Sequence, residues 1–272
     1  MFKPLIILFN FYIKSSIHVA LAVVSLSLIT LNVGLLDISK KVFIFIFFST
    51  LFVYNFIKFF PLVIEGKRKK IPISISLLSV SAGLTSFLLY FYLSLLAQIF
   101  VLLGATLVIF YGIPIFNKSS NWRNKKGWKI YLVVLSWLFL SVGVPLASNS
   151  IFQPTLFLKL TFIQGIFVFV AILPFEIRDL LSDDLRLSTI PQKFGISTTK
   201  KIGYLLLIIG FLFTFFQFYN QIPWIISTGF SFLILAFMLY WSSTKKAYYY
   251  TAFYVEGIPI IWCLSLYLIT YF

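Results

Sequence analysis

The sequence has 272 residues, of which 61% are hydrophobic and 11% are charged. A soluble domain typically carries about 25% charged residues, so a soluble enzyme is excluded and a polytopic membrane protein remains. The net charge is +15, but the basic residues lie in short loops between apolar segments, so membrane topology explains the charge better than nucleic-acid binding does. The single cysteine and the single histidine exclude an intramolecular disulfide and a metal site built from either residue type.

Nine segments are long and apolar enough to cross a bilayer, which takes roughly 20 such residues. No linker or shift in composition divides the chain, so the sequence predicts one domain over residues 1–272, an all-α integral membrane protein. Residues 1–15 are expected to form an interfacial helix that enters the first span. The nine predicted spans are 16–36, 42–64, 72–91, 94–116, 129–148, 154–174, 201–219, 223–242 and 251–271.

The basic residues are distributed asymmetrically about these spans. Of the 22 lysines and arginines, 18 lie in the N-terminal segment and in the loops after spans two, four, six and eight. The positive-inside rule therefore predicts a cytoplasmic N-terminus, cytoplasmic even-numbered loops and an outside C-terminus. No small-residue cleavage site follows the N-terminal segment, so no cleaved signal peptide is expected. The expected location is a bacterial cytoplasmic membrane.

Acidic residues are rare, yet four of the seven fall within nine positions: Glu176, Asp179, Asp183 and Asp184. If span six continues as a helix past Pro174, the first three lie on one face, at about 0°, 300° and 340°. Carboxylates so grouped suit Mg²⁺, which shares its remaining ligands with substrate phosphates. Arg178 lies off this face and is a candidate phosphate contact. The alternative is that the acids only balance nearby basic residues at a helix end.

The stretch 174–195 resembles the second aspartate motif of the UbiA-type intramembrane prenyltransferases. Glu176, Asp179 and Asp183 stand at the acidic positions, followed by Thr189-Ile190-Pro191 and Gly195. Nine spans with a cytoplasmic N-terminus is also the topology of that family. The resemblance covers essentially the whole chain, and it includes a pattern after span four: Tyr111, Pro114, Lys118 and Trp128.

The resemblance implies helices around a central cavity and transfer of a prenyl group from a polyprenyl diphosphate to an acceptor. That acceptor is often an aromatic ring such as a quinone precursor, and a lipid precursor is also possible. The family implies Mg²⁺ as cofactor, and the resemblance assigns both metal binding and catalysis to Glu176, Asp179 and Asp183. The candidate substrate-binding residues are Asn55, Lys58, Tyr111, Lys118 and Arg178.

The chain departs from the family at its first acidic motif, approximately NDxxDxxxD, at the end of span two. Asn55 is present, but Phe56, Phe59 and Val63 occupy the acidic positions. One interpretation is a homologue that has lost turnover and still binds isoprenoid diphosphate or a membrane partner. In the other, Lys58 takes over part of the metal's role across the diphosphate. The alternative for Lys58 is that its ammonium snorkels to the headgroups.

Three further features bear on function. Glu256 lies near the start of span nine, where it either faces a cavity or snorkels to the interface. His18 is expected to be a packed, hydrogen-bonded helix residue. Transport is a competing class, but the spans hold almost no buried charge pairs and no inverted repeat of interrupted helices.

Overall fold

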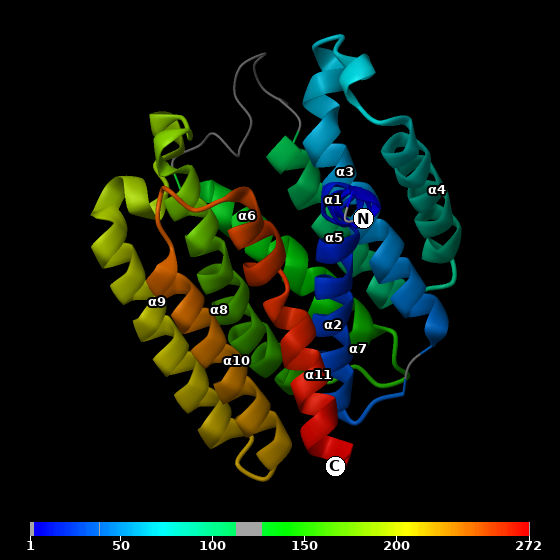
Figure 1. The fold of residues 1–272 in the computed structure, drawn as a ribbon. Coiled ribbons are helices and arrows are strands. Elements are labelled where there is room, and N and C mark those ends of the chain that lie inside the picture. Colours follow the sequence, from blue (N-terminus) through cyan, green and yellow to red (C-terminus); the bar gives the residue numbers. More distant parts are fainter. Residues whose placement is uncertain (1–2, 38, 113–126, 272) are drawn as a thin grey trace.

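The structure is a computed structural model that describes residues 3–37, 39–112 and 127–271. In the described part of the chain, nine helical segments are long and apolar enough to cross a membrane, as the sequence predicts. They run side by side in one bundle, with α2 and α11 near its centre and α4 and α9 at its edges (Figure 1). The spans are formed by α2 (Ile17–Gly34), α3 (Lys40–Ile64), α4 (Ile73–Tyr90), α5 (Leu95–Gly112), α6 with the π-helical turn η3 and α7 (Trp128–Ala147), α8 with the 3₁₀ turn η4 (Pro154–Leu181), α9 (Ile190–Gln217), α10 (Ile222–Trp241), and the π-helical turn η6 with α11 (Tyr250–Tyr271).

The N-terminal helix α1 (Lys3–Lys14) does not run with the spans. In Figure 1 it is seen end-on while the spans are seen lengthwise. Its apolar residues Leu5–Leu8 are exposed, which suits a helix that lies in the plane of the membrane interface. The chain turns sharply into α2 at Ser16, whose backbone is left-handed (φ 67°).

Two polar residues of α3 hold this turn. The Asn55 side-chain amide donates to the Ser15 carbonyl (3.0 Å), and its oxygen accepts from the Ser16 hydroxyl (2.9 Å). The Lys58 ammonium donates to the carbonyl of Lys14 at 2.8 Å and so satisfies an open carbonyl at the end of α1. Asn55 is 1% exposed, because the turn covers it.

The apolar core lies between α2, α6, α8, α10 and α11. The rings of Trp224 and Trp262 stack at its centre, 5.3 Å apart and nearly parallel, and Phe167 packs against Trp262. The peripheral helices α4, α5 and α9 leave long rows of leucine, isoleucine and phenylalanine exposed. These faces suit contact with lipid, which replaces the polar surface that the composition lacks.

A polar network crosses this core at the level of Gln164 on α8. The Gln164 amide donates to the Leu26 carbonyl (3.1 Å) and to the Thr30 hydroxyl (2.9 Å), and its oxygen accepts from the Ser141 hydroxyl (2.9 Å). The π-helical turn η3 (Phe139–Gly143) also presents the Ser141 carbonyl to the Thr30 hydroxyl at 2.8 Å. The network therefore fixes α2, η3 and α8 against one another within the buried core.

The seventh span begins earlier than the sequence analysis expected. The prediction was 201–219, but α9 starts at Ile190, and the Gln192 side chain accepts from the Thr189 backbone N–H (2.9 Å) at its N-terminus. The Thr-x-x-Gln spacing is a capping signal that a hydropathy reading overlooks. Gly195 then interrupts the helix with φ 76° and ψ 165°, a conformation open essentially to glycine alone.

The basic residues of the described segments lie mainly at one end of the bundle. The ends of α3, α8 and α10 and the starts of α4 and α9 lie at the upper end in Figure 1, where Lys67–Lys70, Arg178 and Lys245–Lys246 are found. The start of α3, with Lys40 and Lys41, lies at the opposite end. The basic residues of the described segments therefore concentrate at the end that also holds the acidic cluster.

Candidate functional site

The acidic cluster forms where α8 ends. The expectation that Glu176, Asp179 and Asp183 share one continuous helical face is wrong, because α8 stops at Arg178 and residues Asp179–Leu181 form a 3₁₀ turn. The Asp179 carbonyl accepts from the backbone N–H groups of Ser182 (2.9 Å) and Asp183 (2.8 Å), and from the Ser182 hydroxyl (3.0 Å). Polar side chains that bond to nearby backbone in this way compete with helix continuation.

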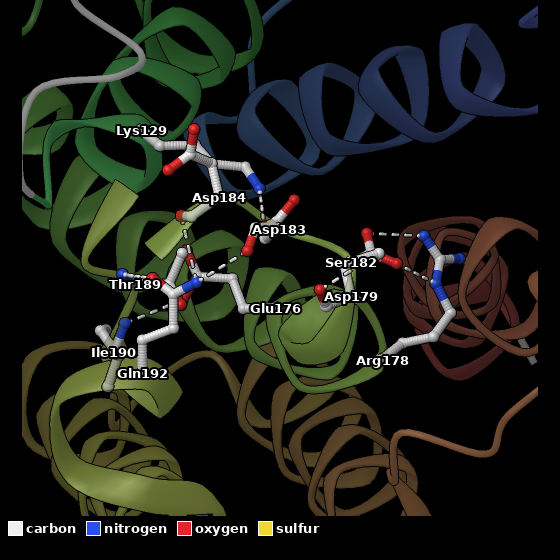
Figure 2. Close-up of polar contacts among 10 residues, drawn as sticks. All are labelled: Lys129, Glu176, Arg178, Asp179, Ser182, Asp183, Asp184, Thr189, Ile190 and Gln192. Carbon is white, nitrogen blue, oxygen red and sulfur yellow. Dashed lines mark hydrogen bonds and ion pairs between the residues drawn. The ribbon is translucent and has the colours of Figure 1, made fainter. Parts of the chain in front are cut away.

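Each of the three carboxylates has its own partner (Figure 2). Asp179 takes the Arg178 guanidinium with both oxygens, at 2.7 and 2.9 Å. Asp183 pairs with Lys129 at the start of α6 (2.9 Å), and both side chains are about one-sixth exposed. Glu176 is buried and accepts from the backbone N–H of Ile190 at 3.3 Å. The three carboxylates therefore point in different directions.

These directions decide how a metal ion fits. Within the described ranges, no group of three histidine, cysteine, aspartate or glutamate side chains lies close enough to hold a metal. The predicted ligand set of Glu176, Asp179 and Asp183 therefore does not form a shared cage. Mg²⁺ needs only one or two protein carboxylates when substrate phosphates supply the other ligands. Asp179 is the member of the set that lines the cavity described next, so the donors fit a metal shared with a substrate.

A cavity of about 260 Å³ opens beside Asp179. Its polar lining comes from five elements, and its remaining wall is apolar. The cavity therefore has a charged end and an apolar interior. Trp137 donates from its indole N–H to the Tyr54 hydroxyl at 2.7 Å and closes one side. The lining residues with polar atoms are Tyr54, Tyr111, Lys129, Trp137, Asp179 and Glu256.

Two smaller apolar pockets, of about 130 and 100 Å³, adjoin this cavity through Tyr54 and Trp137, which line all three. They run between α3, α5 and α6, where Val53, Val108 and Ser136 line both. The polar cavity thus has apolar pockets beside it, on the other side of Tyr54 and Trp137.

The structure brings together part of the predicted site. Tyr111 and Asp179 line the cavity, and Arg178 stands beside it, where it also donates to the Tyr248 carbonyl (3.4 Å) and to the Thr251 hydroxyl. Glu176 and Asp183 lie behind Asp179 and are not among the lining residues. Lys118 lies outside the described residues.

The contacts of Asn55 differ from the substrate-binding role predicted for it. Its amide is buried and engaged with the turn between α1 and α2, on a different side of α3 from the cavity residue Tyr54. Lys58 bonds to the Lys14 carbonyl, but its charge still acts on Glu256, so it belongs to the electrostatic surroundings of the cavity. The two residues share contacts with the same turn, because they lie three positions apart on one helix.

The positions that would carry the first acidic motif are apolar in space as well as in sequence. Phe56 lies in an aromatic row along α3, stacked on Phe60 (ring centroids 4.6 Å) and 6.2 Å from Phe52. Phe52 in turn packs against Gly83 of α4. This part of α3 therefore contributes packing and contains no metal ligand.

Two residues that line the cavity, Lys129 and Glu256, were not predicted as site residues from the sequence. Lys129 was counted only as a loop charge, although it reaches Asp183 across 54 residues of sequence. The sequence predicted that Glu256 either faces a cavity or reaches the interface, and in the structure it lines the cavity. His18 is hydrogen-bonded as expected: its Nε2–H donates to the Phe253 carbonyl (2.9 Å), and its Nδ1 bonds to the Tyr12 hydroxyl (2.7 Å).

Asp184 differs from its three neighbours. It is exposed and pairs with Arg186 (2.6 Å), whose guanidinium and backbone N–H lower the pKa of the Asp184 carboxyl to about 2. For this residue the alternative interpretation holds, because the acid balances a local basic residue at a helix end.

Nine spans around an amphipathic cavity, with an acidic turn at the end of the sixth span, define a membrane protein of the UbiA-type fold. A solved structure of digeranylgeranylglyceryl phosphate synthase in membranes has this architecture: it matches 94% of this chain and 94% of its own, with a TM-score of 0.57 and 15% identity. At that identity the likeness shows the fold, which confirms the fold that the motifs predict. No protein-family profile matches the sequence, and no curated protein matches it.

Proposed function

We propose that the chain is a UbiA-type membrane prenyltransferase that moves a prenyl group from a polyprenyl diphosphate to an acceptor. The observation that carries this proposal is the amphipathic cavity, whose charged end meets an apolar wall with a further apolar pocket beside it. A prenyl diphosphate has the same division, with a charged head and a hydrocarbon tail. The name of the matching synthase supports this substrate class.

The diphosphate would lie at the charged end, within reach of Lys129 and Arg178. Both cations are held in place by carboxylates, so a phosphate oxygen would meet a preorganised charge. Lys118 is retained as a further candidate contact because of its place in the motif after span four. Tyr111 lines the wall and would orient the substrate.

The charge balance of the site favours a bound cation. Four carboxylates, Glu176, Asp179, Asp183 and Glu256, stand near three cations, Lys58, Lys129 and Arg178. A diphosphate adds several negative charges, so added positive charge is needed to hold it. Asp179 would hold Mg²⁺ together with the substrate oxygens, and the bound ion would neutralise the leaving diphosphate.

A homologue that binds the diphosphate without turnover is the second candidate. The specific observation that favours it is the replacement of the first acidic motif by Phe56, Phe59 and Val63, with Phe56 packed in an aromatic row. Such a chain would keep the cavity and the Asp179 turn. Turnover separates it from the enzyme, and binding does not.

Binding of labelled geranylgeranyl diphosphate to the detergent-purified chain tests both candidates at their common step. We expect saturable binding in Mg²⁺ that weakens at least about tenfold in chelator or in Asp179→Asn, because each removes a charge-assisted contact. Lys201→Met, which changes an exposed residue of α9, is the matched surface control. Absence of saturable binding in Mg²⁺ would exclude both candidates.

The proposal includes an orientation. The end of the bundle that carries the acidic turn and the basic helix ends would face the cytoplasm, with the N-terminus and even-numbered loops on that side and the C-terminus outside. The diphosphate would then be drawn from the cytoplasmic leaflet of a bacterial cytoplasmic membrane.

A further inference from the structure

Glu256 differs from the other carboxylates of the site because its oxygens have no hydrogen bond or ion pair among the described residues. Asp179, Asp183 and Glu176 each have a partner at 3.3 Å or less. Asp37 also lacks one, but it is exposed and lies outside the cavity. Glu256 is partly buried and lines the cavity, so it is a cavity carboxylate with no partner in the described part of the chain.

A local distortion of the chain places Glu256. The turn η6 (Tyr250–Val255) is π-helical, and the Glu256 N–H donates to the carbonyl of Thr251, five residues earlier (3.1 Å). π-helical turns occur frequently at functional sites. This turn is anchored from outside, since His18 contacts the Phe253 carbonyl (2.9 Å) and Arg178 donates to the Thr251 hydroxyl.

The surroundings of Glu256 are charged on one side and apolar on the other. The cations that interact electrostatically with its carboxylate are Lys58 on α3 and Arg178 on α8. The phenols of Tyr54 and Tyr248 also interact with it electrostatically. Pro259, Phe167 and Val255 are among the apolar residues that line the same cavity. Neither cation lies within ion-pair distance, so the carboxylate remains able to take a proton.

On the basis of the proposed function, we propose that Glu256 is the proton acceptor for the acceptor molecule in prenyl transfer. The bond between C1 of the prenyl group and the diphosphate oxygen breaks, and its electron pair leaves on the diphosphate. A bond forms between C1 and the acceptor nucleophile. The proton of that nucleophile goes to a Glu256 oxygen, which balances the step and later returns the proton to solvent.

This assignment selects the class of acceptor. A carboxylate in an apolar-walled cavity is useful where the nucleophile must lose a proton and water is excluded. The acceptor would therefore be a hydroxyl compound or an activated aromatic ring, bound on the Tyr54 side of the cavity. Asp179 is less suited to the proton, because both of its oxygens are engaged by the Arg178 guanidinium.

The test uses the detergent-purified full chain with Glu256→Gln, an isosteric change that cannot accept the proton. Glu65→Gln is the matched control, since Glu65 is exposed and paired with Lys67 away from the cavity. Labelled geranylgeranyl diphosphate is supplied with geranylgeranylglyceryl phosphate as a hydroxyl acceptor and with 4-hydroxybenzoate as an aromatic one. Diphosphate binding, labelled product and labelled geranylgeraniol are measured.

We expect Glu256→Gln to bind the diphosphate within about threefold of the unchanged chain and to lose at least about 100-fold in labelled product. Release of geranylgeraniol should persist, because the C1–O bond can still break. Glu65→Gln should match the unchanged chain in every readout. Equal product from Glu256→Gln, or loss of diphosphate binding like that of Asp179→Asn, would overturn the assignment.

A second measurement does not depend on finding the right acceptor. Trimethyloxonium tetrafluoroborate is a small reagent that methylates ionised carboxylates, and peptide mass mapping locates the methyl ester. We expect modification at Glu256 and protection by bound geranylgeranyl diphosphate. An unmodified Glu256 would overturn the assignment even where neither acceptor reacts. Failure of the proposed function would appear separately, as absent diphosphate binding by the unchanged chain.

Discussion

Lys129 links the start of α6 to the acidic turn after α8 through its ion pair with Asp183. Both side chains are mostly buried, so each compensates the desolvated charge of the other. The pair also keeps Lys129 at the cavity wall, where the diphosphate is proposed to bind. A single residue therefore serves both the stability of the turn and the charge of the site.

Removing this cation should cost stability. We expect Lys129→Met to lower the free energy of unfolding by about 1–3 kcal/mol, because Asp183 is left without its partner. The double variant with Asp183→Asn should recover most of the loss, since no buried charge is then unpaired. Thermal melting in detergent measures both, with Lys201→Met as control. A single variant as stable as the unchanged chain would show that the pair contributes nothing.

Asp184 gives a pH-dependent prediction at the same scale. Its folded-state pKa, about 2, lies below the unfolded value of 3.8, so the pair with Arg186 stabilises the fold above that unfolded value and is lost as the pH falls toward 2. In Arg186→Met the guanidinium contacts are lost and the backbone N–H bond remains, so the pKa of the Asp184 carboxyl should rise toward its ordinary value. NMR of carbon-labelled aspartate in detergent micelles follows the titration, and an unchanged midpoint in the variant would contradict this account.

At the scale of elements, α8 organises the molecule. Its middle contains Gln164, which bonds to α2 and η3, and its end supplies the turn that contains Asp179. Apolar helices in lipid gain little from the hydrophobic effect against one another, so packing and hydrogen bonds set their positions. The Gln164 network thus fixes the helix from which the acidic turn projects.

Gln164→Leu removes three of the bonds of this network at similar volume. We expect a loss of about 1 kcal/mol, the usual range for interhelical hydrogen bonds in membranes. Unfolding by titration with dodecyl sulfate measures the change. Thr106→Val is the control, because that exposed hydroxyl bonds only to the Leu102 carbonyl of its own helix. Equal losses in the two variants would mean that the network has no special role.

At the scale of the whole molecule, the orientation is open to direct labelling. In a Cys263→Ala background, Ser150→Cys marks the loop after span five and Lys69→Cys marks the loop after span two; both positions are exposed. A membrane-impermeant maleimide should label Ser150→Cys in intact cells and Lys69→Cys only after permeabilisation. The reverse pattern would invert the proposed topology.

The architecture could be predicted from the sequence because hydropathy and loop charge are local signals. The nine spans, the helix at residues 3–14 and the place of the acidic turn follow from them. The early start of α9 was missed because its first residues carry charge and look like a loop, although the Thr189–Gln192 cap marks the helix start. Helix geometry beyond Arg178 was misjudged because Ser182 and Asp183 bond back to Asp179.

The site was less predictable, because its partnerships cross the fold. Nothing near Asp183 in sequence indicates Lys129, and nothing near Lys58 indicates that it bonds to the end of α1. Asn55 matched a motif, yet its contacts are with a turn that no helical pattern locates. Glu256 was noticed for its rarity, but only the packing of α3, α8 and α11 shows that its carboxylate has no partner among the described residues.

The π-helical turn Tyr250–Val255 makes chain length at this point a determinant of chemistry. Deleting one residue there would restore a regular helix while α11 kept its packing on α2 and α10. Glu256 would stay with α11, while the residues before the deletion would turn by about 100° and carry the Tyr248 carbonyl away from Arg178. Related chains that differ by one residue in this turn are thus expected to hold the Arg178 guanidinium differently beside the cavity, although their spans would align without a gap elsewhere.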